Sequence, residues 1–123
     1  MANYYRIMLG RESAFANRCR EEGFVGGDWD FSESIEQYLV NDMVTFNQAV
    51  IPIYRNNHPE RTNLAAASAC GMLYTICKSI KVGDIVLSPN GSGQYFIGEV
   101  SGDYQFVPGE ILPHRRAIKW LDM

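Results

Sequence analysis

Positive charge, metal-ligand clusters and long apolar runs are all scarce in this sequence of 123 residues. The net charge of −3 argues against a protein that holds polyanions by its overall field, so a nucleic acid would require local basic patches. No apolar run approaches the roughly 20 residues of a membrane-spanning helix, and the N-terminal residues lack the pattern of a signal peptide. We therefore expect a cytoplasmic protein without membrane contact.

Histidine and cysteine are also few, which weakens most catalytic and metal-binding interpretations. His58 lies in a polar loop and His114 lies beside two arginines, and no Gly-x-Ser-x-Gly motif accompanies them, so a catalytic triad is not predicted. Cys70 and Cys77 lie about two helical turns apart without a histidine at a ligand spacing. The sequence indicates buried thiols in a reducing compartment, no metal and no cofactor. A binding protein is favoured over an enzyme.

Two other chemical motifs are present only in incomplete form. Asp84 and Glu99 could imitate the carboxylate pair of a PD-(D/E)xK nuclease, but Ser101 stands where that motif needs a lysine. Asp84 fits a turn instead, and Glu99 could pair with a cation on a neighbouring strand. The Asn90-Gly91 loop lacks the lysine and the following helix of a phosphate-binding loop. It is an ordinary hairpin signal.

The order of predicted elements favours one α+β domain over residues 1–123. A strand over 3–9 precedes a helix over 14–22, capped by Ser13 and ended by Gly23. A brief strand or loop over 24–31 leads to a longer helical stretch from Ser32, which Pro52 should kink or restart. An apolar stripe follows this stretch at Ile35, Leu39, Met43, Phe46 and Val50.

The second half of the chain reads as one helix followed by strands. Thr62 is a plausible cap for a helix over 63–80, and strands are predicted over 81–87, 94–100, 101–107 and 115–121. About three helices beside a small antiparallel, barrel-like sheet are therefore expected.

Aromatic residues among glycines are the remaining functional signal. Trp29 lies in the segment GGDWDF, and Tyr104 follows Gly102. Flat ligands such as nucleobases stack between aromatic faces, and glycines let the backbone approach them closely. Gly98 and Gly102 are predicted to make room for such a base. The residues alone leave open whether Trp29 is simply part of the core.

Several motifs resemble known families. The stretch GDIVLSPNGSGQYFIGEVSGD resembles YTH domains, and KVGDIVL followed by GEV resembles EVE domains, both of the PUA-like superfamily. Over nearly the whole chain, the motifs resemble the N-terminal EVE-like module of Mrr- and McrBC-type modification-dependent restriction proteins. These motifs are YYRIMLGR, GFVGGDWDF, ACGMLYTICKSIKVGDIVL, GEVSGDY and HRRAIKW.

The resemblance implies a PUA-like barrel that reads a modified, methylated DNA base flipped into an aromatic pocket. The implied stacking faces are Trp29 and Tyr104. The residues implied at the base edge are Asp28, Ser88, Asn90 and Ser92, and those implied at phosphates are Arg11, Arg115 and Arg116. The chain departs from the YTH pattern because Gly26 stands where its first cage tryptophan would be, and Tyr104 and Phe106 replace two later tryptophans.

The implied partners are modified DNA and a fused or associated nuclease or NTPase effector. DNA is favoured over RNA by the restriction-protein resemblance alone. An RNA-binding YTH-like reader, and a protein-interaction or small-ligand sensor on the same barrel, stay open. The modified base also stays open among methyladenine, methylcytosine and hydroxymethylcytosine.

Overall fold

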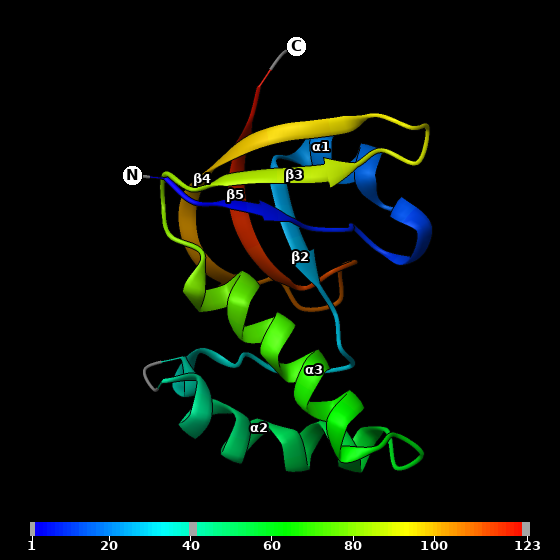
Figure 1. The fold of residues 1–123 in the computed structure, drawn as a ribbon, viewed down its shortest axis with the longest axis vertical. Helices are drawn as coiled ribbons and strands as arrows, with labels where there is room; N and C mark the ends of the chain where they lie inside the picture. Colours follow the sequence, from blue (N-terminus) through cyan, green and yellow to red (C-terminus); the bar gives the residue numbers. More distant parts are fainter. Residues whose placement is uncertain (1, 40–41, 122–123) are drawn as a thin grey trace.

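The structure, a computed structural model, describes residues 2–39 and 42–121 of the chain. These residues form three α-helices and a five-stranded mixed sheet that curls into a half-barrel (Figure 1). The strands are β1 (Tyr4–Arg6), β2 (Phe24–Gly27), β3 (Ile85–Pro89), β4 (Tyr95–Phe106) and β5 (His114–Trp120). Their order is β1-β3-β4-β5-β2, so β1 and β2 are the two edges. The predicted α+β class is confirmed.

Strand direction corrects one part of the expectation. The pairs β3–β4, β4–β5 and β5–β2 are antiparallel, whereas β1 runs parallel to β3. The predicted wholly antiparallel sheet is therefore wrong at this edge, because two strands separated by all the helices need not reverse direction as hairpin strands do.

Strand β4 was expected as two strands, 94–100 and 101–107, but it is continuous. Its pairing with β5 shifts register between Val100 and Tyr104, as a β-bulge does, so the Ser101–Asp103 segment bends the strand without reversing it. The glycines beside this bend serve internal packing. A Cβ at Gly98 would collide with Ile118 and approach the Trp120 ring to 2.8 Å, and one at Gly102 would approach the Ala117 Cβ to 3.1 Å. The prediction that they make room for a base is wrong.

Two of the predicted helix boundaries rest on local hydrogen bonds and are confirmed. Helix α1 (Ala16–Glu22) ends at Gly23, which adopts the left-handed conformation with φ 78°. Helix α3 (Asn63–Tyr74) begins after Thr62, whose side chain accepts a hydrogen bond from the Ala65 N–H at 3.1 Å. Ser13 was a wrong cap, because it lies in the short 3₁₀ helix η1 (Arg11–Ser13) with a positive φ.

The helical stretch expected from Ser32 is divided. A 3₁₀ turn, η2 (Glu36–Tyr38), precedes helix α2 (Met43–Asn57), which begins after Asp42 because that carboxylate accepts the Thr45 N–H at 2.8 Å. Helix α2 continues through Pro52 rather than restarting there, since Pro52 lies on its exposed side, where water can satisfy the freed carbonyl. The predicted stripe is buried except at Met43.

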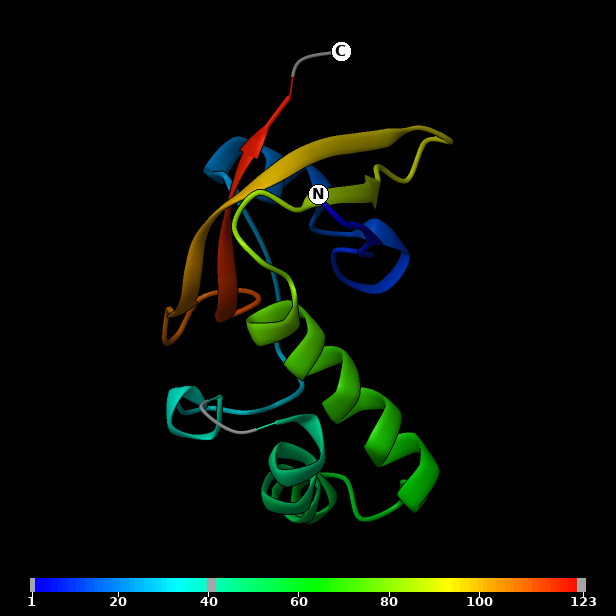
Figure 2. The same cartoon turned by 60° about the vertical axis from the view of Figure 1, so that its left-hand side comes forward.

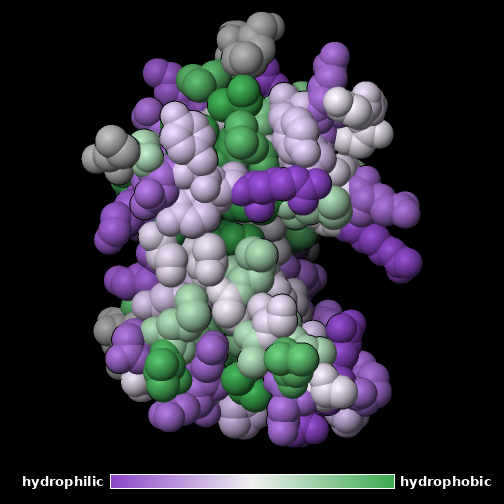
Figure 3. All heavy atoms as spheres, in the orientation of Figure 1, coloured by the Kyte–Doolittle hydropathy of each residue, from purple (hydrophilic) through white to green (hydrophobic). Residues whose placement is uncertain are grey.

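The helices α2 and α3 pack together below the sheet, as Figure 2 shows, and α3 rises from this helical half to meet the sheet half. The Phe46 and Tyr74 rings lie 5.0 Å apart between these two helices. Helix α3 ends in one turn of π-helix, η3 (Thr75–Ser79), directly under the sheet. Figure 3 shows hydrophobic residues on the front of the helical half and an indentation on the right between the two halves. The candidate sites flank the end of α3.

Candidate functional sites

The first site is a cavity of about 480 Å³ between the two sheet edges and helix α3, here called the Trp29 pocket. Residues of β1, of β2 and of the loop after β2 form one side, and α3 and η3 form the other. Its apolar and aromatic lining side chains are Ile7, Met8, Phe15, Trp29, Met72, Ile76 and Leu112. A cavity of this size and apolar character suits a flat organic ring.

Local backbone geometry holds Trp29 at this wall. Trp29 and Asp30 both have positive φ, at 52° and 58°, so the chain turns sharply after β2 and folds the indole back toward the strand. Gly27 makes this possible, because a Cβ at that position would collide with the indole ring. Trp29 is half-buried and packs against the core while it lines the cavity. The indole is therefore held in place by close packing against the β2 backbone.

The two sheet edges bring backbone hydrogen-bonding groups to the same cavity. The register of β2 with β5, together with the bond from Ile118 N to Gly23 O, directs the N–H and C=O of Gly26 away from β5. On β1, the bonds from Ile85 N to Asn3 O and from Ile7 N to Leu87 O likewise direct the Arg6 backbone away from β3. Gly26 and Arg6 both line the pocket. Donors and acceptors thus accompany the apolar walls.

One carboxylate and one guanidinium complete the Trp29 pocket. Asp28 is exposed, and its Oδ1 accepts the Asp30 N–H at 3.1 Å. The Arg6 guanidinium lies 5.9 Å from the centre of the Tyr95 ring, and its Nε donates to the Tyr95 hydroxyl at 3.4 Å. The pocket therefore offers an acceptor and a cation at its edge.

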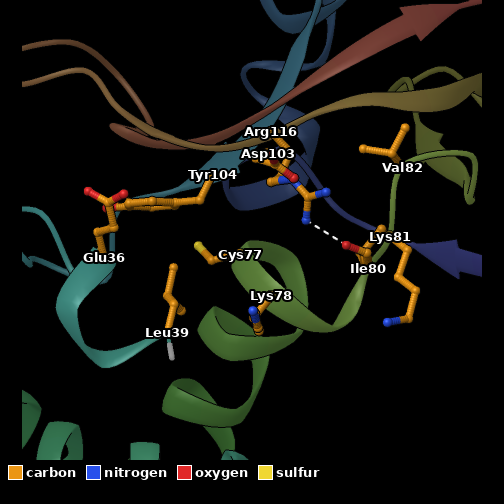
Figure 4. A pocket seen from close by; sticks show the side chains of 10 residues that line it. All are labelled: Glu36, Leu39, Cys77, Lys78, Ile80, Lys81, Val82, Asp103, Tyr104 and Arg116. Atoms are coloured by element: carbon orange, nitrogen blue, oxygen red, sulfur yellow. Dashed lines mark hydrogen bonds between the residues drawn. The ribbon is translucent and has the colours of Figure 1, made fainter. Parts of the chain in front are cut away.

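The second site, here called the Tyr104 pocket, has a volume of about 650 Å³ and lies on the other side of the η3 turn (Figure 4). Leu39, Cys77 and Ile80 supply its buried apolar surface. Its charged lining residues are Glu36, Lys78, Lys81, Asp103 and Arg116. Sequence reasoning placed Trp29 and Tyr104 in one aromatic pocket, but the structure places them in two.

The Tyr104 hydroxyl is engaged within the protein. It accepts the Ile35 N–H at 3.1 Å and lies 2.8 Å from Nδ1 of His114, whose Nε2 lies 2.8 Å from the Phe31 carbonyl. Because a carbonyl only accepts, Nε2 carries the proton and Nδ1 accepts from Tyr104. His114 is fully buried, and burial lowers its pKa, which matches this neutral tautomer.

The Tyr104 ring is also stacked near the His114 ring, with the centroids 6.0 Å apart and the planes at 15°. Burial raises the pKa of the Tyr104 phenol, so its proton stays on the hydroxyl at neutral pH. Tyr104 therefore has a structural role that Trp29 lacks, although both line cavities.

The expectation of an exposed basic patch in HRRAIKW is wrong for its two arginines. The Arg115 guanidinium lies 3.8 Å from the centre of the Phe24 ring and donates to the carbonyls of Ile111 and Leu112, at 2.7 and 3.0 Å. Arg116 is only 3 % exposed. The two residues follow each other on β5, so their side chains lie on opposite faces of the sheet, where Arg115 is covered by Phe24 and Arg116 by the end of η3. Neither forms part of an exposed basic patch. Arg11 alone of the predicted phosphate contacts is exposed.

The polar loop residues lie outside the linings of both pockets. Ser88 is fully buried on β3, and its hydroxyl has no hydrogen-bond partner among the described residues. Asn90 shapes the hairpin, since its Oδ1 accepts the N–H groups of Ser92 and Gln94 at 2.7 and 3.2 Å. The loop lies beside η1, where a Cβ on Gly91 would be 3.7 Å from the Ser13 Cβ. These residues are not brought together with Trp29 or with Tyr104.

Asp84 belongs to a turn, as predicted, and not to a catalytic pair. Its two carboxylate oxygens accept the N–H groups of Asn3 and Lys81, at 3.0 and 2.8 Å, and these bonds lower its pKa. Glu99 is exposed and lies opposite Lys119 in the sheet register.

Nothing in the described part of the chain gathers metal ligands. Three or more His, Cys, Asp or Glu side chains do not meet in a metal-binding group anywhere within it. Cys19, Cys70 and Cys77 are buried and unpaired, and burial raises their pKa values to about 12, 11 and 12. Over the same described residues, no helix has the length and apolar character needed to cross a membrane.

Sequence reasoning missed several lining residues. Met8 and Phe15 reach the Trp29 pocket from the segment after β1, and Met72 reaches it from α3. Met8 and Met72 are exposed in the structure. A hydropathy pattern assigns apolar residues of this kind to the core, so no signal in the sequence indicated that they line a pocket. Lys78 and Lys81 were likewise missed, because the π-turn that presents Lys78 has no local sequence signature.

Comparison with protein families covers nearly the whole domain. Residues 5–123 match a family described as "Domain of unknown function (DUF8426)". The chain belongs to this family. No curated protein and no solved structure matches it.

Proposed function

We propose that this DUF8426 domain is a non-enzymatic reader of a modified, methylated nucleobase, which it binds flipped out of DNA in the Trp29 pocket. The observation that carries the proposal is the combination within one cavity of about 480 Å³: an indole wall, apolar side chains, and backbone groups directed away from the sheet. Stacking on an aromatic face contributes about 1–3 kcal/mol per base. Apolar neighbours favour an added methyl group over water.

The edge of a base would be read by polar groups at the two sheet edges. The Gly26 backbone offers one donor and one acceptor, and the Asp28 carboxylate is an acceptor suited to the exocyclic amine of adenine or cytosine. Two methionines, Met8 and Met72, adapt their shape to an irregular ligand. Thymine lacks that amine, so the proposal favours methyladenine and methylcytosine derivatives.

The sequence resemblance supports DNA as the partner. The half-barrel with α2 and α3 packed below it is compatible with the PUA-like fold that the sequence motifs resemble, and that resemblance is to modules of modification-dependent restriction proteins. We place the domain beside a fused or associated nuclease or NTPase in the cytoplasm. With a net charge of −3, phosphate contacts must be local, and Arg6 and Arg11 are the proposed cations near the pocket.

Fluorescence anisotropy with labelled oligonucleotides tests the proposal. Matched DNA strands carrying methyladenine, methylcytosine, hydroxymethylcytosine or no modification would be titrated, with RNA of the same sequence alongside. We expect one modified DNA to bind at least tenfold tighter than unmodified DNA, with affinity falling as salt rises. Equal affinity for modified and unmodified strands would overturn the reader function, and tighter RNA binding would transfer it to RNA.

Gly27→Ala is the sharpest variant for the pocket, because its added Cβ displaces the Trp29 ring while keeping every side chain that surrounds it. We expect it to lose the preference for modified DNA. Tyr4→Ala is the matched control, since Tyr4 is an aromatic residue of edge strand β1 that is 70 % exposed and does not line the pocket.

A small-ligand sensor is the second candidate, and the apolar lining of the Trp29 pocket favours it. A free methylated nucleobase that binds as tightly as the modified strand, with no salt dependence, would support this function instead. The acidic net charge agrees with such a ligand.

A further inference from the structure

We infer that the Tyr104 pocket is a second ligand site, separate from the Trp29 pocket, and that it binds a phosphate group. The phosphate would belong either to a small phosphorylated molecule or to a nucleic-acid backbone. The inference does not depend on the reader function, because it rests on charged groups that line only this cavity.

Arg116 carries the argument. Its Nε donates to the Gly102 carbonyl at 2.7 Å, and its Nη1 donates to the carbonyls of Ile80 and Ile76 at 2.6 and 3.2 Å. A guanidinium has five N–H donors, so both donors of Nη2 remain without an acceptor among the described residues. Figure 4 shows one terminal nitrogen bonded to the Ile80 carbonyl and the other directed toward the Val82 side of the pocket.

The charge of Arg116 is likewise not paired. Within the described chain, no carboxylate lies within 4.0 Å of the guanidinium, although the side chain is 3 % exposed. Its three carbonyl partners carry partial charges only. Two of them belong to the C-terminal end of the α3–η3 helix, whose negative dipole end attracts the guanidinium but supplies no full counter-charge. A buried cation normally has an ionic partner. An oxyanion in the pocket would supply it, with the bidentate geometry that a guanidinium favours.

The rim of the pocket adds further positive charge. Lys78 on η3 and Lys81 just after it are both exposed and line the cavity. Two carboxylates, Glu36 and Asp103, oppose them, so the ionisable lining has an excess of one positive charge. Asp103 attracts Arg116 from beyond ion-pair distance, so it competes with an incoming anion. This competition makes the affinity for phosphate adjustable in both directions by single substitutions.

Two rim variants and one control variant, which removes an exposed lysine outside the pocket, provide the test. Amide chemical shifts would be followed by NMR while inorganic phosphate is added, with sodium chloride replacing it at equal ionic strength as the blank. We expect shifts concentrated at residues 78–84 and 102–104. Lys78→Gln/Lys81→Gln should weaken phosphate binding at least fivefold, and Asp103→Asn should tighten it at least threefold. Lys119→Gln, an exposed change outside the pocket, should leave it unchanged.

The outcomes separate the two sources of phosphate and the two pockets. Unmodified single-stranded DNA that shifts the same amides would identify a backbone phosphate, whereas shifts with inorganic phosphate alone would identify a small phosphorylated molecule. Trp29→Ala should leave phosphate binding intact even where it abolishes recognition of a modified base. Shifts scattered over all surface cations, or no response to either rim substitution, would overturn the inference.

Discussion

The Trp29 pocket and the Tyr104 pocket flank the same turn of helix, yet they differ in what holds their aromatic residue. Ile76 lines the first and Cys77 lines the second. Trp29 is held by packing on Gly27 and presents its ring to an apolar space, whereas Tyr104 is bonded to Ile35 and His114 in a charged space. An aromatic residue that lines a cavity is thus available for stacking in one case and committed to the fold in the other.

The largest effect is expected when Arg116 is removed, a buried cation that lines the Tyr104 pocket and not the Trp29 pocket. Arg116→Ala removes the donor from three carbonyls, and the two buried ones, of Ile76 and Ile80, each cost about 1–3 kcal/mol when left unsatisfied. We expect a loss of at least about 3 kcal/mol in the free energy of unfolding, measured by urea denaturation. Lys119→Ala on the same strand is exposed and should change stability by less than about 0.5 kcal/mol. If Arg116→Ala and Lys119→Ala both changed the free energy of unfolding by equally small amounts, the hydrogen bonds of Arg116 would not stabilise the fold.

Trp29→Ala should affect binding more than folding. Loss of the stacking face should weaken the binding of modified DNA by about 1–3 kcal/mol, or roughly 5- to 150-fold. Tyr104→Phe keeps its ring and should leave the affinity within about twofold. Anisotropy titrations of both variants measure the difference. A folded Trp29→Ala protein with unchanged affinity would remove the functional distinction between the pockets.

Tyr104→Phe should instead reduce stability. Without the hydroxyl, the Ile35 N–H and the His114 Nδ1 lose their partner, at a cost of about 1–2 kcal/mol. Thermal and urea denaturation, compared with Tyr95→Phe at a more exposed tyrosine, provide the measurement. If both variants were equally stable, Tyr104 would be as free to stack as Trp29.

The smallest effect concerns pH and tests the buried histidine behind Tyr104. Burial lowers the pKa of His114 in the folded state below its unfolded value of about 6.5. The unfolded chain therefore binds a proton first, so stability is full above about pH 6.5 and decreases as pH falls toward the folded pKa. Urea denaturation between pH 8 and 5 in a His58→Gln background isolates this contribution, since His58 is the only other histidine. Stability that does not fall would contradict the neutral tautomer.

Part of the fold could be predicted because local signals set it. Gly23 ends α1 through its own backbone conformation, and Thr62 caps α3 through a bond within one turn. The continuity of β4 was missed because a Ser-Gly-Asp segment is typical of a turn and of a bulge alike, and pairing with β5 decides between them. Trp29 and Asp28 line the same pocket, and their role in binding a base stays a prediction.

The sequence by itself determined the α+β class, the end of α1 at Gly23, the start of α3 after Thr62 and the presence of an aromatic residue among glycines, because caps and turns depend on neighbours along the chain. Only the tertiary structure decided that Trp29 and Tyr104 belong to different pockets and that Arg115 and Arg116 are buried on the two faces of the sheet. The partners of Arg116, Gly102 and Ile80, come from β4 and from the end of η3, which meet β5 only when the sheet curls over η3. Hydrogen bonds across such sequence distances leave no periodic signal in the chain.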